Sequence, residues 1–177
     1  MSYDAVVLDW IPVPGSAKAR LIDAALHTFE QEGYERAAVT DLAAKAGVTT
    51  GALYHHFGSK LGLYTIVRAD LERRITDRML GAADGAGEPG RPAVRTALLV
   101  GFDAAVRFNA CRILGEPHPH DQLDPIRSVL ATLVPEHIET AAAILAAAWR
   151  AALLAVADGA PVESGRAALD FALPPHP

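Results

Sequence analysis

The sequence contains a single cysteine, Cys111, among its 177 residues. One cysteine cannot form an intramolecular disulfide, so the chain is not a disulfide-stapled domain, and it suits a reducing compartment. The first fifteen residues lack a basic segment ahead of an apolar stretch, and they carry two acids, Asp4 and Asp9. They therefore do not have the pattern of a secretory signal peptide. From both absences we expect a cytoplasmic protein.

No uninterrupted apolar run reaches the roughly 20 residues that a bilayer-spanning helix needs. The longest candidate, residues 141–157, contains Arg150. Such a segment is typical of a helix that other helices bury on most sides. We therefore expect no membrane-spanning segment.

Charged residues are also few, at 21% of the chain against 51% hydrophobic residues. This composition is typical of a folded globular protein, and the length allows a core without metal or disulfide. Residues 16–80 carry a net charge of +1, whereas residues 1–15 carry −2 and residues 81–177 carry −4, so the chain as a whole has −5. The overall acidity therefore does not exclude a nucleic-acid partner for residues 16–80.

Apolar residues at helical spacing, bounded by capping residues and glycines, predict an all-α fold. No segment shows the sustained alternation of a strand. Four helices are expected in the first half: one capped by Ser16, a second capped by Thr40 and ended by Gly47, a third beginning at Thr49 or Thr50, and a long fourth capped by Ser59.

Residues 81–92, GAADGAGEPGRP, are rich in glycine and proline, so we expect a loop there. The predicted organisation has three parts: an arm at 1–15, a helical head at 16–80 that includes the fourth helix, and a helical body at 81–177. In the body we expect helices near 93–111, 125–133, 136–158 and 162–172.

The stretch from Thr40 to Lys60, TDLAAKAGVTTGALYHHFGSK, has the composition of a helix-turn-helix. Two short helices that cross steeply need small residues where they meet, and Ala43, Ala44 and Gly47 supply them. The second helix then presents an outer side that can enter the major groove. Its outward positions are Thr49, Thr50, Gly51, Ala52, Tyr54, His55 and His56. Most of them can form hydrogen bonds, and the two smallest permit close approach to a base edge or a thymine methyl group.

From Ala19 to about Met79 the chain resembles the DNA-binding head of the TetR family of bacterial transcriptional regulators. The matching residues are Ile22, Ala25 and Phe29 in the first helix, Gly33-Tyr34, the run VTDLAAKAGVTTGALYHHF, and Ser59-Lys60. The resemblance implies a ligand-responsive, homodimeric, DNA-binding regulator, most simply a repressor that reads a palindromic operator. The body agrees with the family only in the number and length of its helices.

The resemblance also implies roles for individual residues. Thr40 would cap the second helix and touch a phosphate, and Lys60 would hold a phosphate together with backbone N–H groups. Thr49, Thr50, Gly51 and Ala52 would lie where the recognition helix enters the groove. Tyr54 would reach the DNA backbone through its hydroxyl, with His55 and His56 nearby, one of them able to read a base.

The chain departs from the family's pattern in two ways, and the first weakens the expected attraction to phosphates. Only Lys18 and Arg20 precede the core of the first helix, where many members have a basic tail. Leu61 and Gly62 follow Lys60, where an acidic residue is common, so a favourable charge at the helix N-terminus is missing.

The stretch CRILGEPHPHDQLD gathers several potential metal ligands: Cys111, Glu116, His118, His120 and Asp121. Their spacing fits no common zinc pattern, so we expect no bound metal. Two interpretations of this stretch remain: a loop that contacts the effector, or an exposed loop without such a role. No nucleophile stands in a recognisable setting, so we expect neither an enzyme nor a cofactor. The alternatives are a helical dimeric interaction module without DNA binding and, more distantly, a small metal-binding enzyme using Cys111, His118 and His120.

Residues 136–158 predict a helix that is apolar on two sides. One stripe is Ile138, Ala142, Leu145, Trp149, Ala152 and Val156, and the other is Ala141, Ile144, Ala148, Ala151 and Ala155. Such a helix needs two partners, so together with 162–172 we expect it to form a four-helix homodimer interface. Two heads about one helical turn (~35 Å) apart would supply the specificity that one head lacks. A small apolar effector in the body, with Phe102, Phe108 and Trp149 as candidate contacts, would shift the separation of the heads.

Overall fold

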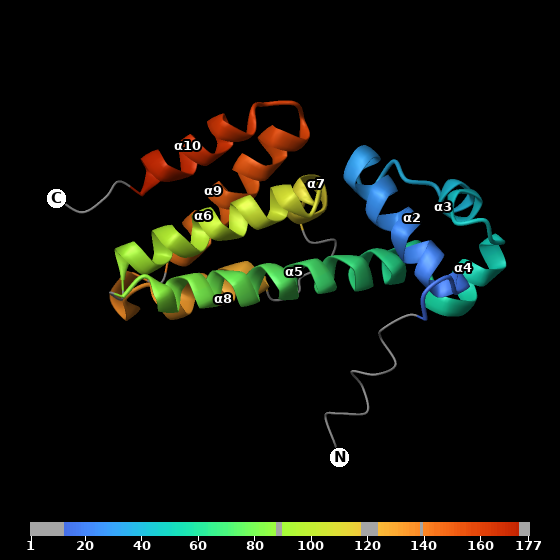
Figure 1. Cartoon of the computed structure of the whole chain (residues 1–177), viewed down its shortest axis with the longest axis horizontal. Coiled ribbons are helices and arrows are strands. Elements are labelled where there is room, and N and C mark those ends of the chain that lie inside the picture. The colour runs from blue at the N-terminus through green and yellow to red at the C-terminus, as the bar shows by residue number, and fades with distance from the viewer. Residues whose placement is uncertain (1–12, 88–89, 118–123, 139, 174–177) are drawn as a thin grey trace, which may run out of the picture. The chain divides into compact units, whose positions relative to one another are not determined.

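The computed structural model describes residues 13–87, 90–117, 124–138 and 140–173, and every regular element in these ranges is a helix (Figure 1). In chain order they are α2 (Ala17–Glu32), α3 (Val39–Lys45), α4 (Thr50–Phe57), α5 (Lys60–Gly85), α6 (Arg91–Arg107), α7 (Cys111–Gly115), α8 (Pro125–Leu133), the short 3₁₀ helix η1 (Glu136–Ile138), α9 (Thr140–Ala157) and α10 (Val162–Ala172). The predicted all-α fold is confirmed.

Two helices of the head begin at the predicted capping side chains, and α4 is capped by Thr49, one of the two residues predicted to begin it. The hydroxyl oxygen of Ser16 accepts a hydrogen bond from the Ala19 N–H at 3.2 Å, and that of Thr49 accepts one from Ala52 at 3.2 Å. At the start of α5 the Ser59 hydroxyl accepts from the Gly62 N–H at 2.9 Å. Each bond satisfies an N–H group that the first turn of a helix leaves unpaired.

Thr40 does not cap α3, and that prediction is wrong. Ala38 is the N-cap, with an extended backbone (φ −91°, ψ 143°) and no side-chain hydrogen bond, so α3 begins at Val39. Thr40 therefore lies inside the first turn, where its side chain cannot reach back to the cap position. Its hydroxyl instead donates to Asp41 Oδ1 at 3.4 Å.

The core of the head is aliphatic and aromatic, and it holds α2, α3 and α4 together. Leu21, Phe29, Leu42 and Leu53 are fully buried in it. The turn after α3 passes through Gly47 at φ +63°, the left-handed conformation that glycine adopts without strain, as predicted. This turn sets the direction of α4.

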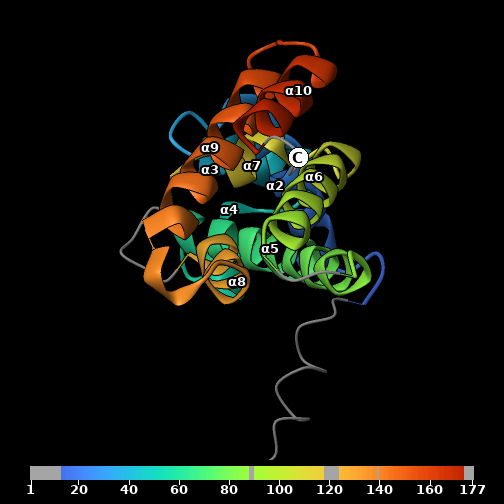
Figure 2. The same ribbon diagram turned by 90° about the vertical axis from the view of Figure 1, so that its left-hand side faces the viewer.

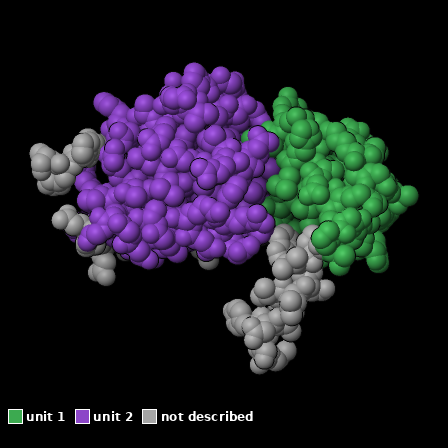
Figure 3. All heavy atoms as spheres, in the orientation of Figure 1, with its two compact units in different colours: residues 1–67 green, residues 68–177 purple. Residues whose placement is uncertain are grey.

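The chain forms two compact units, residues 1–67 and 68–177 (Figure 3). α5 continues to Gly85, so the loop predicted at 81–92 begins five residues too early. Ala83 is buried, and its packing outweighs the low helix propensity of the glycines on either side of it. Residues 68–85 of α5 belong to the second unit, whereas a functional division at 81–92 stays a prediction.

In the body, the helix predicted at 93–111 is two helices. α6 ends at Arg107, and Asn109 has a φ of +51°, which stops the helix before α7 begins at Cys111. Asparagine tolerates this left-handed conformation better than most residues, and nothing in the local sequence distinguishes it from a helical asparagine. α8 and α10 have the predicted bounds, and η1 precedes α9 within the range predicted as one helix.

α9 packs against α7, α8 and α10 (Figure 2). By length and composition it is the one helix in the described part of the chain that could cross a membrane, and only a minority of its residues are buried inside the chain. One such helix is weak evidence for a membrane span. The prediction that other helices bury α9 on most sides is not met within a single chain.

Candidate nucleic-acid interface

The turn between α3 and α4 leaves one side of α4 on the surface of the head. Leu53 and Phe57 are the buried residues of this helix. The predicted outward positions share one surface, with Ala52 half-buried and the others exposed: Thr49, Thr50, Gly51, Tyr54, His55 and His56. Thr40 is also exposed, at the start of α3. The head thus brings the predicted groove-facing residues together, and their contact with DNA stays a prediction.

Gly51 lowers the surface of α4 where no packing demands it. A Cβ placed on Gly51 would meet only the Thr49 hydroxyl oxygen, at 3.6 Å, which is an ordinary contact. The backbone of Gly51 is helical, so the fold does not need glycine there. Glycine in a helix is usually less stable than alanine by about 0.5–1 kcal/mol. The hollow is therefore kept at a cost in stability and allows a close approach to another surface.

Tyr54, His55 and His56 provide the hydrogen-bonding groups on the later turn of α4. The Tyr54 side chain is 52% exposed, which is unusual for a large aromatic residue. The rings of His55 and His56 lie 5.1 Å apart, centre to centre, in an edge-on arrangement. Both imidazoles are exposed at the C-terminal end of the helix, where a positive charge is favourable.

Lys60 is directed into the head. Its ammonium group donates to the carbonyl oxygens of Tyr34 at 2.9 Å and Ala37 at 3.2 Å, with Glu35 at 3.4 Å. It also lies 4.3 Å from the centre of the Tyr34 ring, within the range of a cation–π interaction. Lys60 therefore ties the start of α5 to the turn between α2 and α3, which is a structural role that the sequence did not reveal. Its predicted contact with a phosphate stays untested.

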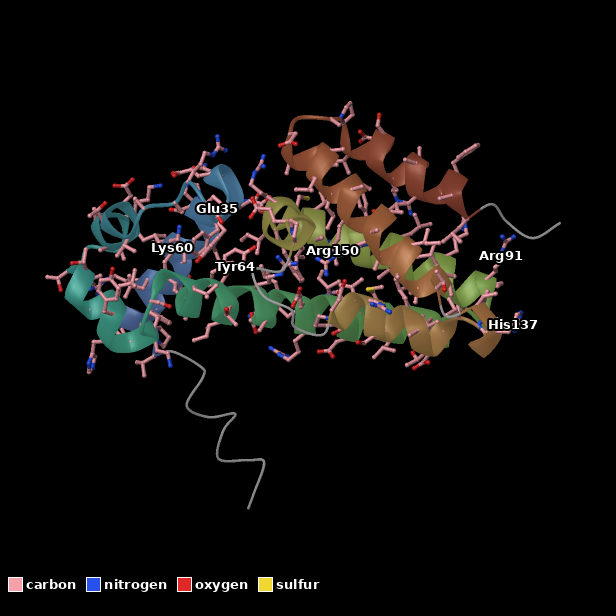
Figure 4. All side chains as sticks on the ribbon, turned by 180° about the vertical axis from the view of Figure 1, so that it is seen from behind. Glu35, Lys60, Tyr64, Arg91, His137 and Arg150 are labelled. Atoms are coloured by element: carbon pink, nitrogen blue, oxygen red, sulfur yellow. The ribbon has the colours of Figure 1, made fainter. Side chains whose placement is uncertain are left out.

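The Tyr34 ring that lies under Lys60 belongs to a cluster of three aromatic rings. Tyr64 lies 4.8 Å from Tyr34 and 5.0 Å from Phe29 between ring centres, the second pair edge-on. Burial, and to a lesser degree the neighbouring charge of Glu35, raises the pKa of the Tyr34 phenol. Figure 4 shows Glu35, Lys60 and Tyr64 in the head.

Other cations of the head are also engaged internally. Arg20 donates to the carbonyl oxygens of Ala46 and Gly15, both at 2.9 Å. Lys45 binds Glu32 at 3.0 Å, and Arg36 donates to the carbonyl oxygen of the same residue at 2.7 Å. The candidate interface on α4 itself is therefore formed by neutral polar groups and two imidazoles.

Arg150, which interrupts the apolar sequence of α9, belongs to an ionic cluster that the sequence did not predict. Its guanidinium group lies 2.6 Å from Asp124 and also donates to the carbonyl oxygen of Leu114. Asp124 caps α8 by accepting from the backbone N–H groups of Ile126 and Arg127. Burial alone would raise the pKa of Asp124, but the hydrogen bond and charge of Arg150 and the two N–H groups outweigh it, and the pKa is lowered.

A second pair in the same cluster comes from α5. Arg68 and Glu72 lie 2.9 Å apart with side chains 1% and 4% exposed, and Arg68 also donates to the carbonyl oxygen of Glu116 at 2.8 Å. Glu72 lies 3.9 Å from Arg150. Buried charges of opposite sign must be paired in this way, so the cluster fixes α5 against α9 and the end of α7.

The residues considered as metal ligands are not brought together in the described part of the chain. Cys111 is buried at the start of α7, and its sequence neighbours His118, His120 and Asp121 lie outside the described residues. Among the described residues no group of three or more histidine, cysteine or acidic side chains could hold a metal ion. Of the candidate effector contacts, Phe102 and Trp149 are fully buried core residues.

The outer side of α9 and α10 is apolar and uncovered in a single chain. Ile144 on α9 is 63% exposed and Phe171 on α10 is 88% exposed. Several alanines on the same two helices are also exposed: Ala147, Ala151, Ala155, Ala167, Ala168 and Ala172. An alanine-rich surface lets another helix approach closely, so this face fits a helical partner.

Known proteins were compared with the chain by sequence. A family described as "Bacterial regulatory proteins, tetR family" matches residues 21–65. The HTH-type transcriptional regulator BetI of Paraburkholderia phytofirmans is 32% identical over 87 residues, which cover 49% of this chain and 45% of that protein. HTH-type transcriptional regulator SrpR of Pseudomonas putida is 46% identical over 58 residues, covering 33% and 27%. The A-factor receptor protein of Streptomyces griseus is 52% identical over 40 residues, covering 23% and 14%. The matches thus span less than half of each relative.

Solved structures resemble the chain over most of its length. A putative tetR family transcription regulator from Shewanella sp. PV-4 aligns with a TM-score of 0.65 at 17% identity, covering 89% of this chain and 95% of that one. A TetR-family transcriptional regulator from Pectobacterium atrosepticum aligns with a TM-score of 0.61 at 25% identity, covering 88% and 91%. The likeness in fold therefore covers much more of the chain than the family match at residues 21–65.

Proposed function

The chain belongs to the TetR family of bacterial regulatory proteins, and from this we propose that it is a DNA-binding transcriptional regulator, most simply a repressor. The observation that carries the proposal is the exposed polar side of α4 with its hollow at Gly51. A helix presented in this way can enter the major groove, where its side chains meet base edges.

In this proposal each exposed group of the head has a task. Thr49, Thr50, Gly51 and Ala52 approach the bases, and the hydroxyl of Tyr54 reaches the DNA backbone. His55 and His56 lie at the edge of the groove, where one imidazole can read a base. Thr40 contacts a phosphate from the exposed start of α3. Lys60 supports this surface from within the head, and a contact of its ammonium group with a phosphate stays a prediction.

The regulator acts as a homodimer that reads a palindromic operator. A single short helix makes few base contacts, each worth about 1–3 kcal/mol, so specificity calls for a second copy. The uncovered apolar face of α9 and α10 supports pairing through residues 136–158 and 162–172, because it offers Ile144, Phe171 and exposed alanines to a partner. Burial of that face would also provide α9 with the cover that it lacks in one chain.

A small apolar effector binds the body and changes the affinity for DNA. α5 is one continuous helix from Lys60 to Gly85, and it carries Arg68 and Glu72 of the ionic cluster that holds α9. A ligand that prefers one arrangement of the body by about 1–3 kcal/mol would change operator affinity 5–150-fold. The cell compartment that fits this function is the cytoplasm, and no catalytic role is proposed, because the relatives are named as transcriptional regulators.

The test is a fluorescence anisotropy titration of the chain with random duplex DNA at two salt concentrations, followed by selection of bound fragments from a random pool. We expect binding that weakens with salt, and selected fragments that share a palindrome. Tyr54→Phe, which removes one hydroxyl from an exposed ring, should weaken binding to the selected site without changing the unfolding temperature. An absence of binding at low salt would favour the dimeric interaction module without DNA binding.

A further inference from the structure

A pocket of about 180 Å³ opens in the body where α6 and α9 begin. Gly90, Arg91 and Val94 at the start of α6 form one wall. The segment that joins α8 to α9 and the first turns of α9 form the others, with Leu173 after α10. Figure 4 labels Arg91 and His137 at this end of the body.

The lining of the pocket is aliphatic. Val134, Pro135 and Ile138 face it from the connecting segment, and Leu145 faces it from α9. Among the described residues of the lining, only Arg91 has a side chain that can form hydrogen bonds. Arg91 is exposed, so its guanidinium group can keep its water while its alkyl stem adds apolar surface to the lining.

The hollow lies apart from the filled centre of the body. Phe102 and Trp149 are fully buried there, and neither lines the pocket. Leu145, by contrast, is only partly buried, although it stands one turn before Trp149 on the same helix. The body thus has a packed core and, at the start of α9, apolar side chains without close neighbours on one side.

We propose that this pocket binds a small neutral apolar molecule of about the size of a substituted benzene ring. An engineered apolar cavity of about 150 Å³ in another protein stays free of water and binds benzene, so the volume is sufficient. A charged ligand would lose hydration against walls whose described lining has one hydrogen-bonding side chain, the exposed Arg91, so a neutral ligand is favoured. For the proposed regulator, this pocket would be the binding site of the effector, and the effector would be a neutral apolar molecule.

The position of the pocket also connects ligand binding with dimer formation, and this part of the inference rests on the proposed dimer. Ile144 lines the pocket and is 63% exposed on the face offered to a second copy. A molecule in the pocket therefore touches a side chain that the second copy would also cover. Because binding free energies are reciprocal, a ligand that changes association at Ile144 is itself bound differently by monomer and dimer.

The experiment is calorimetric titration of the full chain with toluene and with benzoate, which carry the same ring and differ in charge. We expect toluene to bind and benzoate to bind at least about tenfold more weakly, because its carboxylate must shed water. Ala141→Phe places a ring in the pocket and should reduce toluene affinity at least about tenfold, whereas Ala131→Phe, on the exposed side of α8, should leave it unchanged.

A second variant tests the pocket independently, in case Ala141→Phe does not fold. Ile144→Ala removes an exposed wall of the pocket and should weaken toluene binding several-fold while the circular dichroism spectrum stays the same. Failure of toluene to bind, tighter binding of benzoate, or full affinity in Ala141→Phe would each overturn the proposal. None of these measurements involves DNA, so such a result would leave the proposed regulator standing, and failure to bind DNA would leave the pocket standing.

Discussion

The ammonium group of Lys60 lies over the ring of Tyr34, 4.3 Å from its centre, and donates to the carbonyl oxygen of the same residue at 2.9 Å. One side chain thereby satisfies a turn that would otherwise leave backbone acceptors unpaired. The partly buried side chain of Lys60 is therefore engaged within the head. The role of Lys60 can be separated from that of a phosphate contact by experiment.

Lys60→Met should destabilise the head by about 1–3 kcal/mol, because the carbonyl oxygens of Tyr34 and Ala37 lose their donor. The slope of log affinity against log salt for DNA should stay unchanged. A lost phosphate contact would instead reduce that slope by about 0.9. Chemical denaturation and salt-dependent anisotropy measure the two quantities.

Arg73→Met is the control for Lys60→Met, since it removes one positive charge from an exposed position on α5. Its effect on stability should lie within about 0.5 kcal/mol. If Lys60→Met left stability unchanged and flattened the salt dependence, Lys60 would be a phosphate contact after all.

Gly51→Ala should change stability and DNA affinity in opposite directions. The added methyl group meets nothing closer than 3.6 Å and raises helix propensity, so the head should gain about 0.5–1 kcal/mol. The same group fills the hollow on α4 and should weaken binding to the selected operator. Thermal unfolding and anisotropy test both signs, and an affinity equal to that of the wild type would remove Gly51 from the interface.

Asp124→Asn should cost about 1–3 kcal/mol at neutral pH, because asparagine still caps α8 but cannot pair with the charge of Arg150. The pKa of Asp124 is lowered in the folded state, so its charged form contributes stability above the unfolded pKa. That contribution disappears as the pH falls through the folded pKa, below the ordinary value of 3.8.

Urea denaturation of both proteins between pH 7 and acid checks this dependence. The difference between wild type and Asp124→Asn should be constant near neutrality and vanish toward low pH. Asp77→Asn, at a carboxylate that is 65% exposed, serves as the control and should show no comparable difference. A difference for Asp124→Asn that persisted in acid would mean that the charge of Asp124 is not what stabilises the cluster.

Ala151→Glu should convert a dimer to a monomer without unfolding the chain. Ala151 is exposed at the centre of the outer side of α9, so a carboxylate there is hydrated in the monomer and would be buried unpaired in the pair. Sedimentation velocity measures the change, with Ala131→Glu on the exposed side of α8 as the control. Retention of the dimer in Ala151→Glu would place the interface elsewhere.

The sequence predicts those parts of the fold that depend on local chemistry. Ser16, Thr49 and Ser59 cap the helices that follow them, as their side chains and positions indicate. The prediction that Thr40 caps α3 is wrong because Ala38, which has an extended backbone and no capping side chain, begins the helix two residues earlier. The exposed side of α4 followed from helical spacing alone.

What the sequence could not predict depends on distant contacts. The acceptors of Lys60 belong to residues 23 to 26 positions earlier in the chain, so no local pattern marks them. Arg150 and its partner Asp124 are 26 residues apart, and the resemblance in the head says nothing about them. The break at Asn109 reflects a backbone conformation that asparagine tolerates but does not require.

The internal engagement of Arg20, Arg36, Lys45 and Lys60 would have a kinetic consequence for the proposed regulator during its search for an operator. Each of these cations is bound by a carbonyl or carboxylate group of the head, so turning toward the phosphates of an arbitrary duplex would cost it a contact that it makes in the free protein. The protein would stay bound to unrelated DNA only briefly. Its search would proceed by repeated binding and dissociation and not by long sliding along the duplex. Crowded chromosomal DNA would then sequester few copies, and most of the protein would remain free to find its target.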